Sequence, residues 1–390
     1  MRVKRDRGAR ACGVRAAGAG FARTALALGV VMGLCVAGAP VAHALDEITT
    51  QEYVGPLGVD NEVATGYTGK GIKIGVIDGP ADTTAPELAG ANVTVKPMCS
   101  FTASDAHRSH ATAMVSILSA RGYGVARGAE IINYSTPAAE DNDPSACATT
   151  SIDDAINAAV ADGVKVISAS VGKGDLAELA RGAITGAVAR GVVVVVATGN
   201  DGLQDPADSL SSINGTVGVG ASDSNGNYQS FSNYGRGLTV LAPGNNTWVH
   251  DFAESGRIRG ARGTSYAAPI VAGFLAVTMQ RWPSATGNQV VQSLVHTATT
   301  GPTGQPLLNP NGLDTTDPTQ FPDENPLMDK FPGTEPSAQT VADYRDGVLT
   351  TESVFEDASY VYRGVDAEVA RAHADRSALG TSPRYHRKED

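Results

Sequence analysis

The chain has 390 residues, with 41 acidic and 30 basic side chains, 45 glycines, 20 prolines, four cysteines and 42% hydrophobic residues. This composition excludes a collagen-like, a cysteine-dense and a wholly disordered protein, and the length predicts one large domain or two smaller ones. The acidic balance argues against a nucleic-acid partner, because such binding depends on clustered lysine and arginine side chains that neutralise phosphates.

The first 44 residues differ in charge from the rest of the chain. They hold seven basic side chains and one acidic one, whereas the remainder holds 23 basic and 40 acidic side chains. An uncharged apolar stretch follows Arg23, and residues 42–44, Ala-His-Ala, have the small-x-small pattern of a signal-peptidase site. We therefore predict a signal peptide over 1–44 and a secreted, extracellular protein.

The same apolar stretch also permits a second interpretation. Residues 24–42 are about as long as a membrane-spanning helix needs to be, so an uncleaved anchor would hold the protein at the membrane. Pro40 and the small-residue site are unusual in an anchor, and no later segment stays apolar long enough to span a bilayer.

Two cysteines, Cys99 and Cys147, follow the predicted leader. In an oxidising compartment an isolated pair is more often bridged than free, which predicts a disulfide between them. Two unrelated buried thiols are the alternative that the sequence leaves open.

Residues 69–296 alternate short β-branched runs with helical patterns. The predicted strands are 72–77, 130–135, 164–170, 192–197, 216–221 and 238–241, and the predicted helices are 112–120, 151–161, 175–190 and 265–281. The first four strands are too continuously apolar for a sheet with one face in water. The pattern therefore predicts an α/β fold with a central, mostly parallel sheet between layers of helices.

Four polar residues lie where a fold of this kind usually places its functional groups. Asp78 and Asn200 each end an apolar strand, Ser265 starts the longest helix, and His110 opens a shorter one. Taken singly, each has an ordinary structural explanation as a turn residue, a helix cap or a surface histidine. Together they provide the carboxylate, imidazole, amide and hydroxyl groups that nucleophilic acyl transfer needs.

These residues and their surroundings resemble the subtilisin-like serine proteases, the peptidase S8 or subtilase family, over residues 54–300. Residues 263–273, Gly-Thr-Ser-Tyr-Ala-Ala-Pro-Ile-Val-Ala-Gly, are similar to the family's nucleophile segment, including the proline inside the helix. Residues 69–78 resemble its aspartate segment, and 196–202 its oxyanion-asparagine segment. The resemblance implies a three-layer subtilisin-like fold and a serine endopeptidase.

The resemblance also implies a role for each candidate residue. Ser265 would attack the scissile carbonyl to form an acyl-enzyme, His110 would transfer the proton, and Asp78 would orient the imidazole. Asn200 would donate to the developing oxyanion. The substrate, a protein or peptide, would contact Ser170, Val171, Gly172, Ala197, Thr198 and Gly199. We expect a monomer without a metal or other cofactor.

Two segments depart from the family pattern. The family's histidine segment reads His-Gly-Thr-His-Val-Ala-Gly, whereas residues 110–116 read His-Ala-Thr-Ala-Met-Val-Ser. We choose His110 over His107 because the threonine two places on and the apolar run match only from 110. The family aspartate is followed by Ser or Thr and then Gly, but Asp78 is followed by Gly79 and Pro80, so a hydroxyl that normally supports the carboxylate is missing.

These departures leave two alternatives to a general endopeptidase. One is an inactive relative that binds peptides, and the other is a dedicated maturation protease for a single exported partner. Neither alternative changes the expected fold.

A calcium site of the kind found in many secreted family members is not expected. Residues 121–126 lead directly to the next strand without the Asn-rich loop that forms that site, and Glu87, which lies where those enzymes often offer a ligand, is expected to be a surface charge.

We expect four regions along the chain. They are the leader 1–44, a short N-terminal extension 45–66, the peptidase domain 67–300 and an acidic C-terminal extension 301–390. Some actinobacterial relatives, the mycosins of type VII secretion, similarly combine a signal peptide, a short extension and disulfides. Residues 301–331 are expected to form a linker or a wrapping arm, with possible helices over 337–346 and 359–374.

Overall fold

The computed structural model describes residues 45–138, 141, 152–170, 176–205, 209–330 and 336–349, with the side chains of 176–179 excepted. The predicted leader, Cys147, Val171, Gly172 and the possible helix 359–374 lie outside these residues. Cys99 is recorded in a disulfide, and its pairing with Cys147 stays a prediction.

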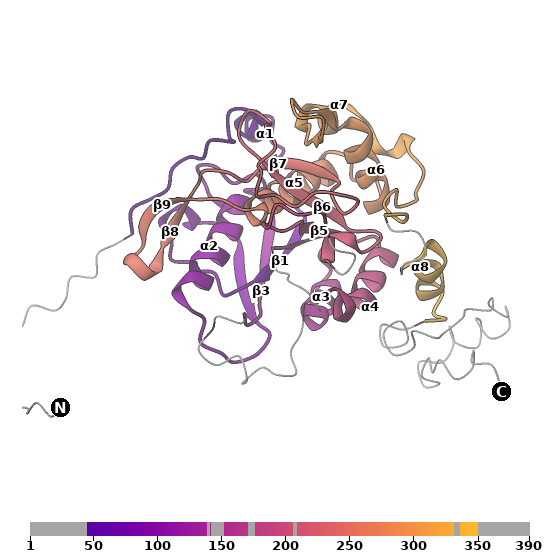
Figure 1. Cartoon of the computed structure of the whole chain (residues 1–390), viewed down its shortest axis with the longest axis horizontal. Helices are drawn as coiled ribbons and strands as arrows, with labels where there is room; N and C mark the ends of the chain where they lie inside the picture. The colour runs from indigo at the N-terminus through magenta and orange to yellow at the C-terminus, as the bar shows by residue number, and fades with distance from the viewer. Residues whose placement is uncertain are drawn as a thin grey trace, which may run out of the picture. The chain divides into compact units, whose positions relative to one another are not determined.

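A nine-stranded sheet forms the centre of the described chain (Figure 1), in the order β10-β11-β7-β6-β5-β4-β1-β3-β2. Neighbouring strands are parallel except β10 and β11. The strands are β1 (Lys73–Asp78), β2 (Val93–Pro97), β3 (Glu130–Ser135), β4 (Val166–Ala169), β5 (Val193–Ala197), β6 (Val217–Ser222), β7 (Val240–Pro243), β10 (Thr299–Thr300) and β11 (Pro306–Leu307). The α/β fold with a mostly parallel sheet is therefore confirmed.

Helices cover both faces of the sheet, and a small antiparallel hairpin lies beside it. They are α1 (Val59–Ala64), α2 (Asp105–Ser119), α3 (Ile152–Ala161), α4 (Leu176–Ala189), α5 (Thr264–Arg281), α6 (Gly287–Thr297), α7 (Pro310–Thr315) and α8 (Ala338–Arg345), with the hairpin strands β8 (Thr247–Asp251) and β9 (Arg257–Ala261). Successive residues of a strand point to opposite faces, so β5 contributes Val193 and Val195 to one core and Val194 and Val196 to the other.

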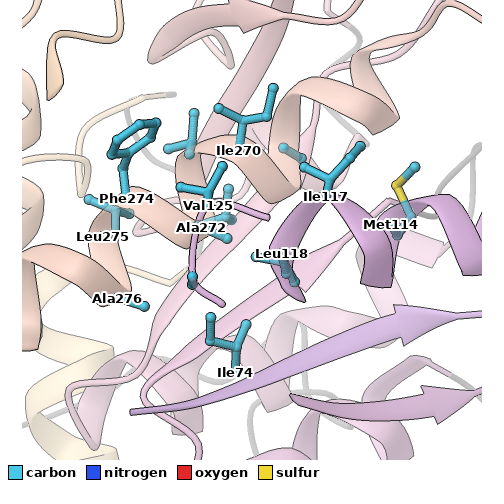
Figure 2. Packing of buried hydrophobic residues seen from close by; sticks show 14 of the residues in the cluster. Ile74, Met114, Ile117, Leu118, Val125, Ile270, Ala272, Phe274, Leu275 and Ala276 are labelled. Carbon is cyan, nitrogen blue, oxygen red and sulfur yellow. The ribbon is translucent and has the colours of Figure 1, made fainter. Parts of the chain in front are cut away.

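The first core lies between the sheet and the helices α2 and α5. Figure 2 shows Ile117 of α2 and Ile270 of α5 in this cluster with Ile74 of β1. α5 also passes very close to the chain after α2, because a Cβ at Gly273 would lie 2.8 Å from Val125. This packing fixes the start of α5 relative to α2, where the candidate serine and histidine lie.

The structure corrects some expected boundaries. α2 begins at Asp105 rather than at Thr112, because the Ser104 side chain caps it by accepting a hydrogen bond from the His107 N–H at 3.1 Å. His110 therefore lies inside the helix rather than opening it. The hairpin, β2 and α6 were not predicted; β2 is a partly exposed edge strand without a continuous apolar run.

Both flanking segments pack onto the peptidase core. In the N-terminal extension, the Gln51 amide donates to the Trp248 carbonyl at 2.8 Å and accepts from its N–H at 2.9 Å. In the C-terminal arm, residues 301–330 and 336–349, Leu307 pairs with Leu241 of β7, and the Tyr344 ring of α8 lies under the guanidinium of Arg190, which follows α4. Of the two expected forms, these residues adopt the wrapping arm.

Glu87 is not the surface charge that the sequence suggested. It is buried, and its carboxylate lies 3.0 Å from His250 Nε2 on β8, while the Tyr123 hydroxyl donates to it at 3.4 Å. A buried carboxylate needs such partners because its desolvation is costly. Among the helices described, none is both long and apolar enough to cross a bilayer.

Candidate active site

The fold brings the four candidate residues to one edge of the sheet. Asp78 is the last residue of β1, and Asn200 follows β5 by three positions. Ser265 lies in the first turn of α5, and His110 in α2. The carboxyl ends of parallel strands are where open α/β sheets present functional groups.

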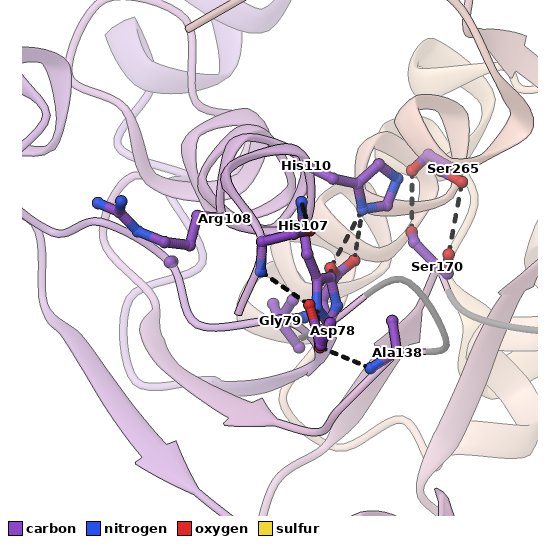
Figure 3. A network of polar contacts seen from close by, with 12 residues as sticks. Asp78, Gly79, His107, Arg108, His110, Ala138, Ser170 and Ser265 are labelled. Carbon is purple, nitrogen blue, oxygen red and sulfur yellow. Dashed lines mark hydrogen bonds and ion pairs between the residues drawn. The ribbon is translucent and has the colours of Figure 1, made fainter. Parts of the chain in front are cut away.

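Asp78 and His110 form the best-defined contact of the site. Asp78 is fully buried, and His110 Nδ1 lies 3.1 Å from its Oδ1 and 2.9 Å from its Oδ2. A carboxylate only accepts hydrogen bonds, so Nδ1 carries the hydrogen and Nε2 is left as the basic nitrogen. Figure 3 shows the imidazole between the Asp78 carboxylate and Ser265.

The start of α5 is tied to the end of β4 through Ser265. The Ser170 hydroxyl donates to the Ser265 carbonyl at 2.9 Å, and the Ser265 hydroxyl donates to the Ser170 carbonyl at 3.4 Å (Figure 3). The helix begins after Gly263, so the Ser265 N–H belongs to the first turn, where backbone donors lack intrahelical acceptors. The hydroxyl and the backbone N–H of Ser265 therefore lie together at the start of α5.

Asn200 is held by its amide oxygen. This oxygen accepts from the Thr264 N–H at 2.8 Å and from the Thr264 hydroxyl at 3.1 Å. Because the oxygen is engaged, the amide nitrogen is the end that can donate to a substrate. The residue before Ser265 therefore orients the candidate oxyanion donor.

Asn233 organises the loop that carries Asn200. Its amide donates to the Thr198 carbonyl at 3.1 Å and accepts from the N–H groups of Asp201 and Leu203 at 3.0 and 3.2 Å. Gly199 has φ 108°, and a Cβ there would lie 2.4 Å from the Asn233 amide nitrogen, so only glycine fits. The sequence had indicated no role for Asn233.

Asn133 on β3 holds the loop after Asp78 in the same way, through hydrogen bonds of its side-chain amide. Its side chain accepts from the Ala81 N–H at 2.9 Å and donates to the carbonyls of Gly79 and Val76 at 3.1 and 3.3 Å. Sequence reasoning missed this residue. The available signal was an amide inside the segment 131–134, Ile-Ile-Asn-Tyr, at a position now seen to be fully buried.

His107, the histidine not chosen for the triad, also lies beside Asp78. Its Nδ1 is 2.9 Å from Asp141 Oδ2, and its Nε2 is 3.7 Å from Asp78 Oδ1. His110 makes the shorter contact with Asp78 and has a side chain 28% exposed, whereas His107 is 6% exposed. Nothing in the sequence had pointed to Asp141, which lies 34 positions further on.

Four of the six expected substrate-binding residues are described. Ser170 follows β4, Ala197 ends β5, and Thr198 and Gly199 continue from it. Thr198 is buried, with its hydroxyl donating to the Asn233 carbonyl at 3.4 Å, so its side chain stabilises the loop. Within the described ranges no group of three or more His, Cys, Asp or Glu side chains could hold a metal ion.

Comparison with known proteins places this chain in a family. The model of the subtilase family, peptidase S8, matches residues 69–317. The chain is 32% identical over 262 residues to M-protease of Shouchella clausii, covering 65% of this chain and 67% of that protein. It is 33% identical over 238 residues to subtilisin BL of Lederbergia lenta, covering 60% and 86% respectively.

Solved structures with the same fold include two from type VII secretion systems. MycP1 from the ESX-1 system is 22% identical, with a TM-score of 0.55, covering 74% of this chain and 91% of that one. MycP3 from the ESX-3 system is 22% identical, with a TM-score of 0.56, covering 71% and 90%. The family match spans more than half of the chain, and the chain accordingly belongs to the subtilase family and is a subtilisin-like serine peptidase.

Proposed function

We propose that this peptidase is a secreted endopeptidase that uses Ser265, His110 and Asp78 as a catalytic triad. Ser265 Oγ attacks the scissile carbonyl carbon while His110 Nε2 takes the hydroxyl proton. Collapse of the tetrahedral intermediate transfers this proton to the leaving amine and leaves an acyl-enzyme on Ser265. Water, deprotonated by His110, then releases the acyl product.

The observation that carries this proposal is the hydrogen bond between His110 Nδ1 and Oδ1 of the buried Asp78 carboxylate, at 3.1 Å. This contact fixes the tautomer in which Nε2 is unprotonated, and it stabilises the imidazolium that forms when Ser265 loses its proton. Without that carboxylate the imidazole would have no reason to present its basic nitrogen to the serine.

The oxyanion of the tetrahedral intermediate would be bound by the Asn200 amide nitrogen and the Ser265 N–H. Both donors are oriented before substrate arrives, Asn200 through Thr264 and the backbone N–H through α5. Preorganised donors of this kind stabilise developing charge without reorganisation.

The substrate would lie along the ends of β4 and β5. Residues 170–172 would offer backbone groups for strand-like pairing with an extended peptide, and 197–199 would line the primary pocket. No charged side chain occurs in either segment, which favours an uncharged residue before the scissile bond. Export would follow the leader 1–44, with anchorage by an uncleaved segment as the alternative.

Digestion of casein by the chain without residues 1–44 tests the proposal, with Ser265→Ala as the matched control and mass spectrometry of the fragments. Cleavage that the substitution abolishes is the expected result. No cleavage, with Ser265 still labelled by a fluorophosphonate, would instead identify a maturation protease for one partner. The absence of both cleavage and labelling would contradict the triad.

A further inference from the structure

The space beside Asp78 is filled by the imidazole of His107. Where the family has a hydroxyl side chain after the aspartate, this chain has Gly79, and a Cβ there would lie 2.6 Å from Cδ2 and 2.7 Å from Nε2 of His107. The φ of Gly79 is not in the left-handed region, so this glycine is required by space rather than by backbone conformation. Gly79 and His107 are therefore matched: a side chain at 79 and an imidazole at 107 exclude each other.

The His107 ring is fixed in orientation by Asp141. The Asp141 carboxylate accepts from the N–H groups of Ser104 and Ala138 at 2.8 and 2.7 Å, and from His107 Nδ1 at 2.9 Å. Burial acts to raise the pKa of Asp141, but the backbone hydrogen bonds and the contact with His107 outweigh it and lower the pKa. Asp141 is thus an ionised acceptor, and His107 Nδ1 is the donor.

This orientation turns Nε2 of His107 towards Asp78. The distance to Asp78 Oδ1 is 3.7 Å, which is beyond hydrogen-bond range but within range of a strong electrostatic contact. If Nε2 were unprotonated, its lone pair would face a carboxylate oxygen and the contact would be repulsive. If Nε2 carries a hydrogen, the ring is an imidazolium between two carboxylates and both contacts are attractive.

Asp78 has few other donors. Its Oδ1 accepts from the Gly79 N–H at 2.7 Å and from His110. Within the described part of the chain no hydrogen bond is aligned on its Oδ2, despite the 2.9 Å approach of His110. A fully buried carboxylate in this state needs a nearby positive charge. We propose that His107, held by Asp141, is a positioning residue whose imidazolium fixes the Asp78 carboxylate in place of the missing hydroxyl. This inference rests on the triad proposed above.

Asp141 also limits the electrostatic cost of this arrangement. A lone positive charge near Asp78 would oppose the imidazolium that His110 becomes during catalysis. The Asp141 carboxylate neutralises His107, so the pair acts on His110 only as a dipole. The nearby Arg108 is engaged elsewhere, with Asp82 at 3.0 Å and Asp105 at 3.3 Å.

Two substitutions at position 107 distinguish the contribution of Nδ1 of the ring from that of Nε2. His107→Asn places an amide nitrogen where Nδ1 lies and keeps the bond to Asp141, but it leaves nothing towards Asp78. His107→Gln can reach towards Asp78 as Nε2 does. We expect kcat on a peptide substrate to fall about 10-fold to 100-fold in His107→Asn and less in His107→Gln, with KM unchanged. His296→Asn, a matched change on α6 away from the site, should leave kcat as it is.

The match between positions 79 and 107 provides a reciprocal test. Gly79→Ser alone should lower kcat by collision with His107, and His107→Ala alone by loss of the imidazolium. Together the two changes make room for a serine hydroxyl beside Asp78. The double variant should recover kcat above both single variants, a non-additivity expected only of residues that share one site.

A measurement on the unmodified protein complements the variants. Nitrogen-15 NMR with labelled histidine, at the pH of the activity assay, should show both ring nitrogens of His107 protonated. An unprotonated Nε2, a His107→Asn variant with the kcat of the parent, or a double variant no better than the single ones would each overturn the inference. An inactive parent protein, by contrast, would contradict the proposed function and not the role of His107.

Discussion

The two halves of the candidate site are built differently. The serine half, Ser265 with Asn200, is held through Thr264 and Ser170, and Asn233 supports the loop that carries Asn200. The aspartate half, Asp78 with His110, is surrounded by side chains from distant places, Asn133 and Asp141 among them. The serine half therefore lies in segments that match the family pattern, whereas the aspartate half combines the departures at Gly79 and Ala111 with support from His107 and Asp141.

The largest expected effect is in the serine half. Ser265→Ala removes the attacking oxygen, and we expect kcat to fall by about 10⁶-fold, as loss of the nucleophile does in subtilisin. His110→Ala should be similarly severe, because the hydroxyl then has no base. In the double variant kcat should be little lower than in either single variant. A fall in kcat equal to the product of the two single falls would contradict a shared triad. Steady-state kinetics on a peptide substrate provides the comparison.

The oxyanion donor comes next in size. Asn200→Ala should lower kcat by about 100-fold to 1000-fold with KM little changed, because the amide acts on the transition state. Asn225→Ala, in an exposed turn, is the matched control and should leave kcat unaltered. A selective rise of KM in Asn200→Ala would instead indicate ground-state binding.

Asn133→Ala measures how far the aspartate half depends on remote support. The substitution leaves the Ala81 N–H and the carbonyls of Gly79 and Val76 without their side-chain partner in a buried site. We expect the free energy of unfolding to fall by about 1–3 kcal/mol, and kcat to fall because the loop after Asp78 loosens. Urea unfolding and kinetics report the two effects, and loss of stability with kcat intact would show that this loop does not position Asp78.

The smallest expected effect is a pH dependence of stability that arises at His250, outside both halves of the site. Burial acts to lower its pKa, but hydrogen bonding and charge from Glu87 and a bond to the Gly256 carbonyl raise it above the usual 6.5. The stability that this pair contributes should be complete below pH 6.5 and decline as pH rises through the higher pKa of the folded state. Melting temperatures across pH test this, and Glu87→Gln should flatten the decline. A parent protein that instead gains stability over this range would contradict the assignment.

The sequence predicted the sheet well and singled out the residues that the structure brings together in the candidate site, because both depend on information that is local along the chain. Continuous apolar runs identified the buried strands, and Ser265 and Asn200 lie in short segments with specific residue orders. Strand and helix ends shifted by one or two residues, except at α2, where the Ser104 cap had gone unrecognised.

The parts that could not be predicted depend on three-dimensional proximity. His107 was set aside on its pattern, yet it fills the space that Gly79 leaves, which only the structure could show. Glu87 was expected at the surface, because the hairpin that carries His250 had not been predicted. The departures at Gly79 and Pro80 suggested a weakened site, and the structure places an imidazole beside the carboxylate instead.

Reaction with a fluorophosphonate, followed by peptide mapping, would examine the proposed triad without requiring the natural substrate. The proposal predicts a single adduct on Ser265 that is absent in Ser265→Ala and forms much more slowly in His110→Ala. An adduct on another residue, or a rate at Ser265 that does not depend on His110, would contradict the assignment of these residues as one catalytic unit.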